Sequence, residues 1–276
     1  MIQSTAPTAT LEADVDHDRS PFEGEDSGIE MPMISIVVPV LNEERLLERT
    51  LAAFGPDLRE RHGVELIVSD GGSTDRSVEI ARRHADLVVE HREERRQTIA
   101  EGRNRGGERA RGELLVFING DTIPVDPERF LAALVEVSKG IAVGSGVAAV
   151  ACPVEIEPAE RRTSDRLFHT FFNAYVRLLN RLGLGAGRGE CQVMPRELFV
   201  RVGGYNDTMA AGEDFDLYNR LAQHGRIAHH QGLLVYESPR RFRRYGYLRV
   251  LFQWTLNGIA VAVAGRSYSK EWEQVR

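Results

Sequence analysis

Short apolar runs alternate with amphipathic stretches along the first half of this chain. Residues 34–38 form a β-branched run that ends at Pro39, a pattern typical of a buried strand. The same reasoning predicts further strands and helices in alternation: strands at 64–68, 86–90 and 114–118, and helices at 42–54, 74–84 and 95–111. Because strand and helix follow each other in this way, the pattern favours βαβ units and a parallel sheet.

Polar clusters follow directly after three of these predicted strands, at 39–43, 70–75 and 119–121. Right-handed crossovers place the carboxyl ends of parallel strands along one edge of a sheet, and open α/β sheets bind ligands at that edge. We therefore expect the three clusters to lie close together and to form part of a binding site.

The second half of the chain is less regular. Its pattern predicts a series of further elements: a strand at 144–154, helices at 164–182, 195–201 and 213–224, short strands within 226–236 and a closing helix at 245–264. The glycine-rich stretch 183–189 is expected to be mobile. The apolar part of the closing helix is too short and too polar to span a bilayer, so we interpret it as an amphipathic helix, buried or lying on a membrane.

Composition and charge narrow the class of protein. Hydrophobic residues are 42% and charged residues 28% of the 276, which fits a soluble globular chain. The net charge is −6, and residues 1–30 carry eight acidic residues and one basic residue, so the rest is nearly neutral and bulk charge does not favour nucleic-acid binding. We expect a disordered acidic tail at 1–30, a domain at 31–240 and a basic, aromatic segment at 241–276.

Two further observations concern the cellular compartment. Only Cys152 and Cys191 occur, without the spacing of a metal site, which suits a reducing cytoplasm. The first 30 residues lack the basic and apolar regions of a signal peptide. These features favour a cytoplasmic protein.

Two of the polar clusters carry candidate chemistry. In Asp70-Gly71-Gly72-Ser73-Thr74-Asp75, a carboxylate and exposed backbone N–H groups can bind a nucleoside or a phosphate, although the segment also fits a capped strand–turn–helix connection. In Asn119-Gly120-Asp121, the aspartate can hold Mg²⁺ or Mn²⁺ against a diphosphate, although the triplet also fits an ordinary β-turn.

A third acidic segment, Gly212-Glu213-Asp214-Phe215-Asp216-Leu217, opens the predicted helix at 213–224. Acids in a first helical turn complement the helix dipole, which is one explanation for them. A carboxylate on a rigid helix can alternatively act as a general base toward a hydroxyl group.

These three segments in this order resemble the inverting glycosyltransferases of family 2, which have a GT-A fold, that is, a Rossmann-like, mostly parallel sheet flanked by helices. The resemblance extends over about residues 33–236 and includes several further motifs: Val37–Glu44, Gly102-Arg103-Asn104-Arg105-Gly106, Ala110-Arg111-Gly112 and Gly203-Gly204-Tyr205. It implies transfer of a sugar from a nucleotide-diphosphate donor, such as a UDP- or GDP-sugar, to a hydroxyl acceptor.

The resemblance also implies roles for individual residues. Asp214 matches the catalytic base, with the adjacent Glu213 as its rival. The donor-binding positions are Pro39, Asn42, Glu43, Asp70, Arg103, Asn104, Asn119 and Asp121. Asp121 matches the metal-binding acid of the family's Asp-X-Asp motif, and His229 or His230 is a candidate to complete the site for Mg²⁺ or Mn²⁺. Asn119 stands where the family has the first acid of that motif, which weakens the case for metal dependence.

Arginines alternate with aromatic residues between Arg240 and Arg249. They can form a solvated basic face, or bind anions: Arg241 and Arg244 are candidates for contacts with the donor diphosphate or an anionic acceptor, and the segment can meet anionic lipid headgroups. Gln192, after the glycine-rich stretch, is expected at the acceptor pocket. The sequence does not identify the acceptor; one candidate is a lipid-linked hydroxyl compound, for which the enzyme would act at the inner face of the cell membrane.

Two other classes of function remain as alternatives. A sugar nucleotidyltransferase shares a related sheet, but its first strand is usually followed by a glycine-rich, basic loop, whereas here the loop is Pro39-Val40-Leu41-Asn42-Glu43. A non-catalytic sugar-nucleotide binder is favoured by Asn119 and opposed by Asp121 and Asp214.

Overall fold

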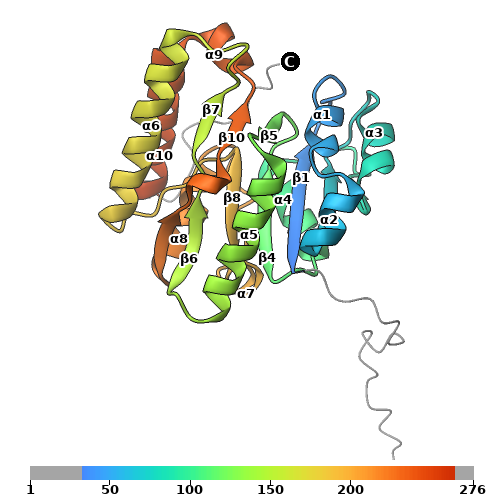
Figure 1. Cartoon of the computed structure of the whole chain (residues 1–276). Coiled ribbons are helices and arrows are strands. Elements are labelled where there is room, and N and C mark those ends of the chain that lie inside the picture. Colours follow the sequence, from blue (N-terminus) through green and yellow to red (C-terminus); the bar gives the residue numbers. More distant parts are fainter. Residues whose placement is uncertain (1–32, 265–276) are drawn as a thin grey trace, which may run out of the picture. The chain divides into compact units, whose positions relative to one another are not determined.

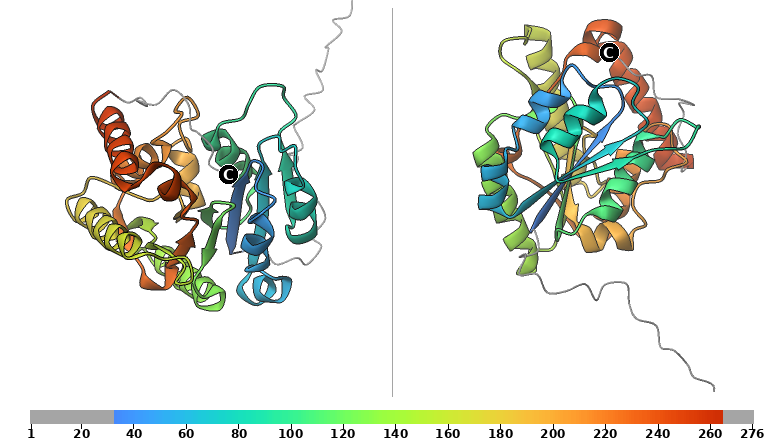
Figure 2. Two further views of the ribbon diagram at one scale, coloured as in Figure 1. Left: turned by 90° about the horizontal axis from the view of Figure 1, so that it is seen from above. Right: turned by 90° about the vertical axis from the view of Figure 1, so that its right-hand side faces the viewer.

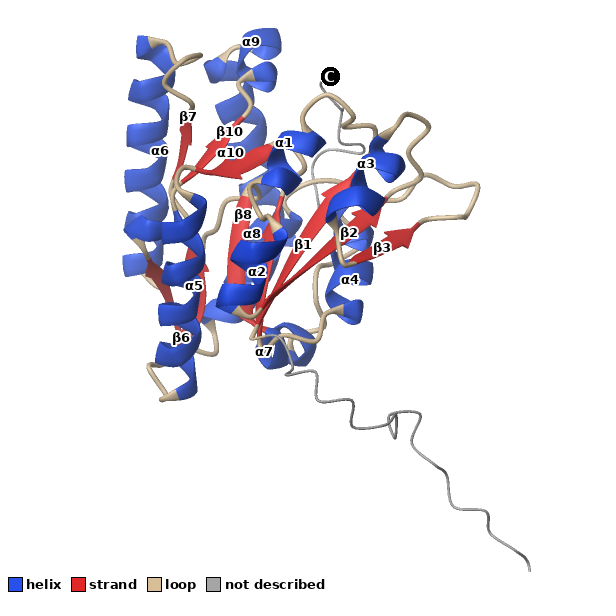
Figure 3. Ribbon diagram, turned by 45° about the vertical axis from the view of Figure 1, so that its right-hand side comes forward, coloured by secondary structure: helices blue, strands red, loops and turns tan. Residues whose placement is uncertain are grey.

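A seven-stranded sheet lies at the centre of the computed structural model, which describes residues 33–264 (Figure 1). The predicted acidic tail at 1–30 and the last twelve residues of the predicted segment 241–276 lie outside the described residues. The predicted fold class is confirmed: the sheet is mostly parallel, helices cover both of its faces (Figure 3), and a long helix closes the described chain.

The strand order in the large sheet is β3-β2-β1-β4-β8-β6-β9, and a small sheet has the order β5-β10-β7. The strands are β1 (Ile34–Val40), β2 (Val64–Asp70), β3 (Leu87–Glu90), β4 (Leu114–Ile118), β5 (Thr122–Pro124), β6 (Val147–Ala151), β7 (Val154–Ile156), β8 (Cys191–Pro195), β9 (Arg226–His229) and β10 (Val235–Glu237). Strands β3, β2, β1 and β4 are parallel, whereas β8 runs antiparallel to both of its neighbours. The carboxyl ends of β1, β2 and β4 therefore meet at one edge.

The helices alternate with these strands in the first half of the chain. They are α1 (Leu47–Ala52), α2 (Pro56–His62), α3 (Ser77–His84), α4 (Ile99–Arg109), α5 (Pro127–Ala142), α6 (Thr163–Arg181), α7 (Arg196–Arg201), α8 (Glu213–Ala222), η1 (a 3₁₀ turn, Gln231–Leu233), α9 (Arg240–Tyr245) and α10 (Tyr247–Ala264). Alternate residues of β1 point to opposite sides: Ile36 packs among α1 and α5, whereas Val37 packs in the cluster that contains α6, α7 and α8.

Several predicted boundaries differ from the structure. Pro56 begins the additional helix α2 instead of only ending α1, because proline is well suited to the first turn of a helix. The predicted strand 144–154 is two strands that belong to different sheets, β6 and β7. Helix α5 was not predicted at all, although Asp126 caps it and Pro127 begins it.

The C-terminal helices α9 and α10 pack against α6 through aromatic rings. Phe242 of α9 and Tyr247 of α10 lie 5.2 Å and 4.7 Å from the ring of Phe168, and Trp254 lies 5.4 Å from that of Phe172. The predicted helix 245–264 starts at Tyr247, after Gly246 with a φ of 76°. Helices α6 and α10 consequently lie side by side (Figures 1 and 2). Within residues 33–264, no helix has both the length and the apolar character needed to cross a bilayer.

Candidate active site

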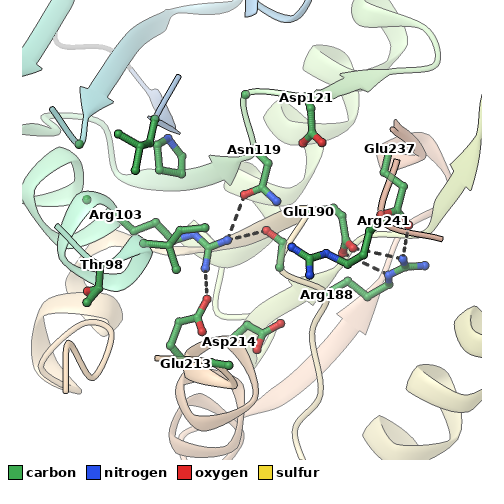
Figure 4. Close-up of a pocket in the computed structure, with 18 of the residues that line it drawn as sticks. Thr98, Arg103, Asn119, Asp121, Arg188, Glu190, Glu213, Asp214, Glu237 and Arg241 are labelled. Carbon is green, nitrogen blue, oxygen red and sulfur yellow. Dashed lines mark hydrogen bonds and ion pairs between the residues drawn. The ribbon is translucent and has the colours of Figure 1, made fainter. Parts of the chain in front are cut away.

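A cavity of about 390 Å³ lies at the carboxyl ends of the parallel strands. Its walls come from the ends of β1 and β4, the start of α4, the loop before β8, the start of α8, and the helices α9 and α10. The predicted site residues that line it are Pro39, Glu43, Arg103, Asn119, Asp121, Glu213, Asp214 and Arg241. The structure thus brings together acids that are far apart in the sequence (Figure 4).

On one side of the cavity, Arg240 binds two carboxylates through one nitrogen. Its Nη2 atom lies 2.9 Å from Oδ2 of Asp121 and 3.0 Å from Oε2 of Glu43. Burial and the neighbouring charge of Asp121 raise the pKa of Glu43 to about 7, although Arg240 opposes this shift. The two acids therefore lie close enough for the charge of one to raise the pKa of the other, and the guanidinium group of Arg240 contacts both.

On the other side, Arg103 is fully buried and holds three elements together. Its guanidinium donates to Oε1 of Glu213 at 2.8 Å, to Oδ1 of Asn119 at 3.1 Å and to the carbonyl of Gly189 at 2.7 Å, as Figure 4 shows. It also lies over the ring of Tyr205, 5.1 Å from its centre. Asn119 is thus held by an arginine on α4, and its side chain still lines the cavity.

Asp214 is the neighbour of Glu213 at the start of α8, but it does not share the ion pair with Arg103. Its Oδ1 atom accepts a hydrogen bond from the backbone N–H of Phe215 at 2.9 Å. Burial and the charge of Glu213 raise the pKa of Asp214 to about 7, and the more distant Arg103 only partly offsets them. Near neutral pH, this carboxylate is therefore able to take up and release a proton.

The loop 185–190 forms another part of the wall and is held by packing, in contrast to the mobility expected from its glycines. A Cβ atom at Gly187 would lie 2.6 Å from the ring of Tyr218. Gly185 has a φ of 60°, and a Cβ atom there would lie even closer to the carbonyl oxygen of Tyr218. Glycine is thus required here for close approach, and residues 185–188 are buried.

The sequence analysis missed a buried cluster around Arg188, which also lines the cavity. Its guanidinium lies 2.6 Å from Oε1 of Glu237 and 3.3 Å from Oε2 of Glu190, and it contacts the ring of His169 (Figure 4 draws the first three residues). Burial acts to raise the pKa of both acids. The charge of Arg188 nevertheless holds the pKa of Glu190 below its usual range, whereas the pKa of Glu237 lies well above its usual value. The sequence signal that could have revealed this cluster is that Arg188 lies two residues before Glu190.

Two predicted donor-binding residues, Asp70 and Asn42, form hydrogen bonds with the backbone of the loop 72–74. The carboxylate of Asp70 accepts hydrogen bonds from the backbone of Gly72 and Ser73, at 2.9 Å and 3.0 Å. The side chain of Asn42, which has a positive φ of 54°, accepts a hydrogen bond from the backbone of Thr74 at 2.8 Å and does not cap α1. Neither residue is among those that line the cavity.

Three other predicted residues do not line the cavity either. Asn104 bonds to the backbone of Tyr205 through both ends of its amide. Gln192 was expected at the acceptor pocket, but it lies in the core on β8, where it accepts a hydrogen bond from the hydroxyl of Tyr205 at 2.6 Å. Arg244 is exposed, and its guanidinium lies over the ring of Tyr245.

The two histidines proposed as metal ligands lie elsewhere. His229 and His230 line a second cavity beside α5 and β6, at the other edge of the large sheet from β3. The Nδ1 atom of His229 bonds to the carbonyl of Ala151, and His230 interacts with Glu136. The prediction that either one completes a metal site with Asp121 is therefore wrong. In the described part of the chain, no three His, Cys, Asp or Glu side chains cluster as metal ligands.

The mostly parallel sheet, the buried acid at the start of α8 and the acids at the strand ends match the GT-A fold that the sequence predicts. Residues 35–203 match the family described as "Glycosyl transferase family 2", and this is more than half of the chain. The chain therefore belongs to glycosyltransferase family 2. This family match does not favour the alternative of a sugar nucleotidyltransferase.

Named relatives agree with this assignment. Validoxylamine A glucosyltransferase of Streptomyces hygroscopicus subsp. limoneus is 32% identical over 103 residues, which cover 36% of this chain. Across the first three curated relatives, the chain spans only 22–32% of the relative's length.

Two solved structures have a similar fold. A mannosyltransferase from Pyrobaculum calidifontis, in complex with GDP-Man and Mn²⁺, has a TM-score of 0.65 at 21% identity and covers 94% of this chain and 70% of its own. Glucosyl-3-phosphoglycerate synthase from Mycobacterium tuberculosis, in complex with Mn²⁺, UDP-glucose and phosphoglyceric acid, has a TM-score of 0.56 at 23% identity and covers 86% and 82%. At these identities, the likeness shows the fold.

Proposed function

We propose that this enzyme transfers a sugar from a nucleotide-diphosphate donor to a hydroxyl acceptor with inversion at the anomeric carbon, and that Asp214 is the general base. The observation that carries this proposal is the carboxylate of Asp214, which lines the cavity and whose pKa is raised to about 7. A base with a pKa near the working pH is well suited to remove a proton from a hydroxyl group as that group attacks.

The choice of Asp214 over Glu213 rests on their partners. Glu213 forms a buried ion pair with Arg103, so its carboxylate is occupied and its charge is compensated. Asp214 receives one hydrogen bond from the backbone and retains an oxygen for the acceptor. In this proposal, Glu213 is a positioning residue that anchors Arg103 and, by its charge, raises the pKa of Asp214.

The donor is proposed to bind across the ends of β1 and β4, where Pro39, Glu43, Asn119 and Asp121 line the cavity. UDP- or GDP-sugars are the proposed donors, which is supported by the complexes of the two similar structures with GDP-Man and with UDP-glucose. Asn119 provides an uncharged oxygen and amide that suit a ribose or sugar hydroxyl.

The residues present fit a divalent cation that binds together with substrate phosphates. The carboxylates of Asp121 and Glu43 converge on one nitrogen of Arg240, so the chain itself provides a position for a cation between two oxygen ligands. Mg²⁺ and Mn²⁺ are bound by one or two carboxylates plus phosphate oxygens, and they neutralise the charge of a leaving diphosphate. Both similar structures contain Mn²⁺.

Arg240 and Arg241 are proposed to bind the diphosphate of the donor. Both lie at the start of α9 and line the cavity. Burial lowers the pKa of Arg241, while nearby acids oppose this shift, and its side chain points toward Glu190 in Figure 4. Guanidinium groups bind phosphate oxygens in pairs, so an entering diphosphate can exchange the carboxylates of Glu43 and Asp121 for its own oxygens.

The cellular location is also part of the proposal. A cytoplasmic location is supported by the small number of cysteines, two in 276 residues. We also propose that the acceptor is a lipid-linked hydroxyl compound at the inner face of the membrane.

The test combines donor binding with the stereochemistry of the product. A thermal-shift screen of nucleotides with and without Mn²⁺ should single out UDP or GDP, because a ligand that binds the native state raises its stability. Transfer from the matching sugar nucleotide is then followed by NMR of the anomeric proton. We expect a product with the opposite anomeric configuration to the donor. A product with retained configuration would contradict the proposed mechanism, and a bound donor with no transfer to any hydroxyl acceptor would contradict the proposed activity.

A further inference from the structure

Helix α6 exposes large apolar side chains on the side that faces away from the core. Its inner side is buried through Phe168, Phe172 and Val176. On its outer side, large apolar residues recur at intervals of three or four, so they share one face: Leu167, Phe171, Tyr175, Leu178 and Leu182. We call these five residues the α6 stripe. Leu167 is 73% exposed and Phe171 is 55% exposed, which is unusual for neighbouring large apolar side chains.

Helix α5, which is of similar length, shows how a solvent-facing helix of this chain looks. Its exposed side carries both signs of charge, from Glu128, Arg129, Glu136 and Lys139, and its large apolar residues are turned inward. The α6 stripe differs in both respects. Helix α10 also exposes two large apolar side chains, Leu248 and Phe252, but the α6 stripe has five of them along one face.

The charged side chains that α6 itself exposes are all basic, although the exposed Glu160 lies just before the helix. Arg162, Arg166 and Arg181 are exposed, and between residues 161 and 188 the only acid is Asp165. That carboxylate is buried, and it forms an ion pair with Arg243. The neighbouring segment 238–264 also contains no acid and exposes Arg244 and Arg249. In a chain with a net charge of −6, α6 and the segment 238–264 therefore expose arginines together with large apolar side chains.

We propose that the α6 stripe is a membrane-binding surface that lies in the headgroup region of an anionic bilayer. An apolar strip flanked by arginines matches such an interface, because the apolar side chains enter the acyl boundary while the guanidinium groups bind lipid phosphates. A second copy of the chain is a poorer partner, since pairing of two such faces would bring like charges together. This assigns the membrane contact to α6, whereas the sequence pattern had suggested 245–264.

The same helices form part of the cavity wall, which connects this surface with the acceptor. Phe172 of α6 and Trp254 and Asn257 of α10 line the cavity. A protein that rests on a bilayer through the outer side of α6 therefore keeps one wall of its cavity next to the lipid, where a hydroxyl group on a lipid carrier is available.

The test is co-sedimentation of the full chain with vesicles, and it does not require a known sugar donor. We expect binding to vesicles of phosphatidylcholine and phosphatidylglycerol and little binding to phosphatidylcholine alone. The variant Phe171→Ser/Leu178→Ser should lose about tenfold or more in affinity, and Arg166→Glu/Arg181→Glu should do the same. The control Val143→Ser/Val200→Ser removes exposed apolar side chains elsewhere and should bind like the wild type.

Thermal unfolding of each variant shows whether its fold is intact. Absence of wild-type binding to the anionic vesicles would overturn the proposal, and so would equal binding by the wild type and a folded Phe171→Ser/Leu178→Ser variant. Sedimentation equilibrium without lipid tests whether a second copy of the chain covers the α6 stripe instead. If the wild type forms a dimer, the Phe171→Ser/Leu178→Ser variant is a monomer and neither binds vesicles, the α6 stripe is a dimer interface and the membrane proposal is overturned.

Discussion

The two sides of the cavity are built from the same kinds of residue, yet they have different chemistry. On each side an arginine meets two acids. Arg240 binds both of its acids, Glu43 and Asp121, through one nitrogen, whereas Arg103 pairs with Glu213 and leaves Asp214 outside the ion pair. The difference lies in how the positive charge is shared.

The two arginines also differ in burial, which affects whether their ion pairs can be exchanged. Arg240 is on a short helix at the rim of the cavity and is partly exposed, so its pairs can be exchanged for a metal ion or a diphosphate. Arg103 is fully buried and is fixed by three partners from different elements, so its pairing is permanent. The pKa of one acid is raised on each side, that of Glu43 and that of Asp214, but only Asp214 lies outside the ion pair of its arginine.

The largest expected effect is on turnover. Asp214→Asn keeps the shape of the side chain but removes its basicity, so turnover should fall by about 10²–10⁴-fold while donor affinity changes little. Asp216→Asn is the matched control: it alters an acid of the same helix turn that pairs with Arg220 and does not line the cavity. Near-normal turnover of Asp214→Asn, measured under saturating donor, would exclude this residue as the base.

The next effect is on stability. Arg103→Met leaves the charge of Glu213 buried without its partner, which should lower the free energy of unfolding by about 3–5 kcal/mol. Arg105→Met, on the same helix as Arg103, breaks the exposed pair with Glu93 and should have a much smaller effect. Urea denaturation compares the two variants, and similar losses for both would show that Arg103 is not the structural centre of the site.

The smallest of the three effects concerns the exchangeable side. Arg240→Met removes the cation that pairs with Glu43 and Asp121, so Mn²⁺ should bind the nucleotide-free protein about fivefold more tightly, the equivalent of about 1 kcal/mol for a partly exposed pair. Arg244→Met is the control, because Arg244 does not line the cavity. Calorimetric titration with Mn²⁺ measures both affinities. Unchanged or weaker binding by Arg240→Met would refute the competition between arginine and metal.

The first half of the fold could be predicted because its signals are local. Buried strands such as 34–38 and 114–118 are continuous apolar runs, and the helices between them have a clear period, so the parallel sheet and its polar edge follow. Helix α5 had equally local signals, the cap Asp126 and the first-turn Pro127, and was missed nonetheless. The glycines at 185 and 187 were misinterpreted because close packing against Tyr218 is a tertiary effect.

The site could be predicted only in part, for a related reason. The acids were found because each follows a strand or opens a helix, and those places are visible in the sequence. The arginine that pairs with each acid could not be predicted, because the partners are far apart in the sequence. Arg240 is 119 residues from Asp121, and Arg103 is 110 residues from Glu213. Which arginine binds which acid, and hence which acid has a raised pKa, depends on how distant elements pack together.

The most direct test of the central claim is the titration of Asp214 itself. The enzyme is labelled with ¹³C at the aspartate carboxylates, and the resonance of Asp214 is assigned by its absence in Asp214→Asn. We predict a midpoint of about 7, since burial and Glu213 disfavour the charged form, so the base becomes active as the pH rises through that value. A midpoint near the usual value of an aspartate, about 4, would contradict the account.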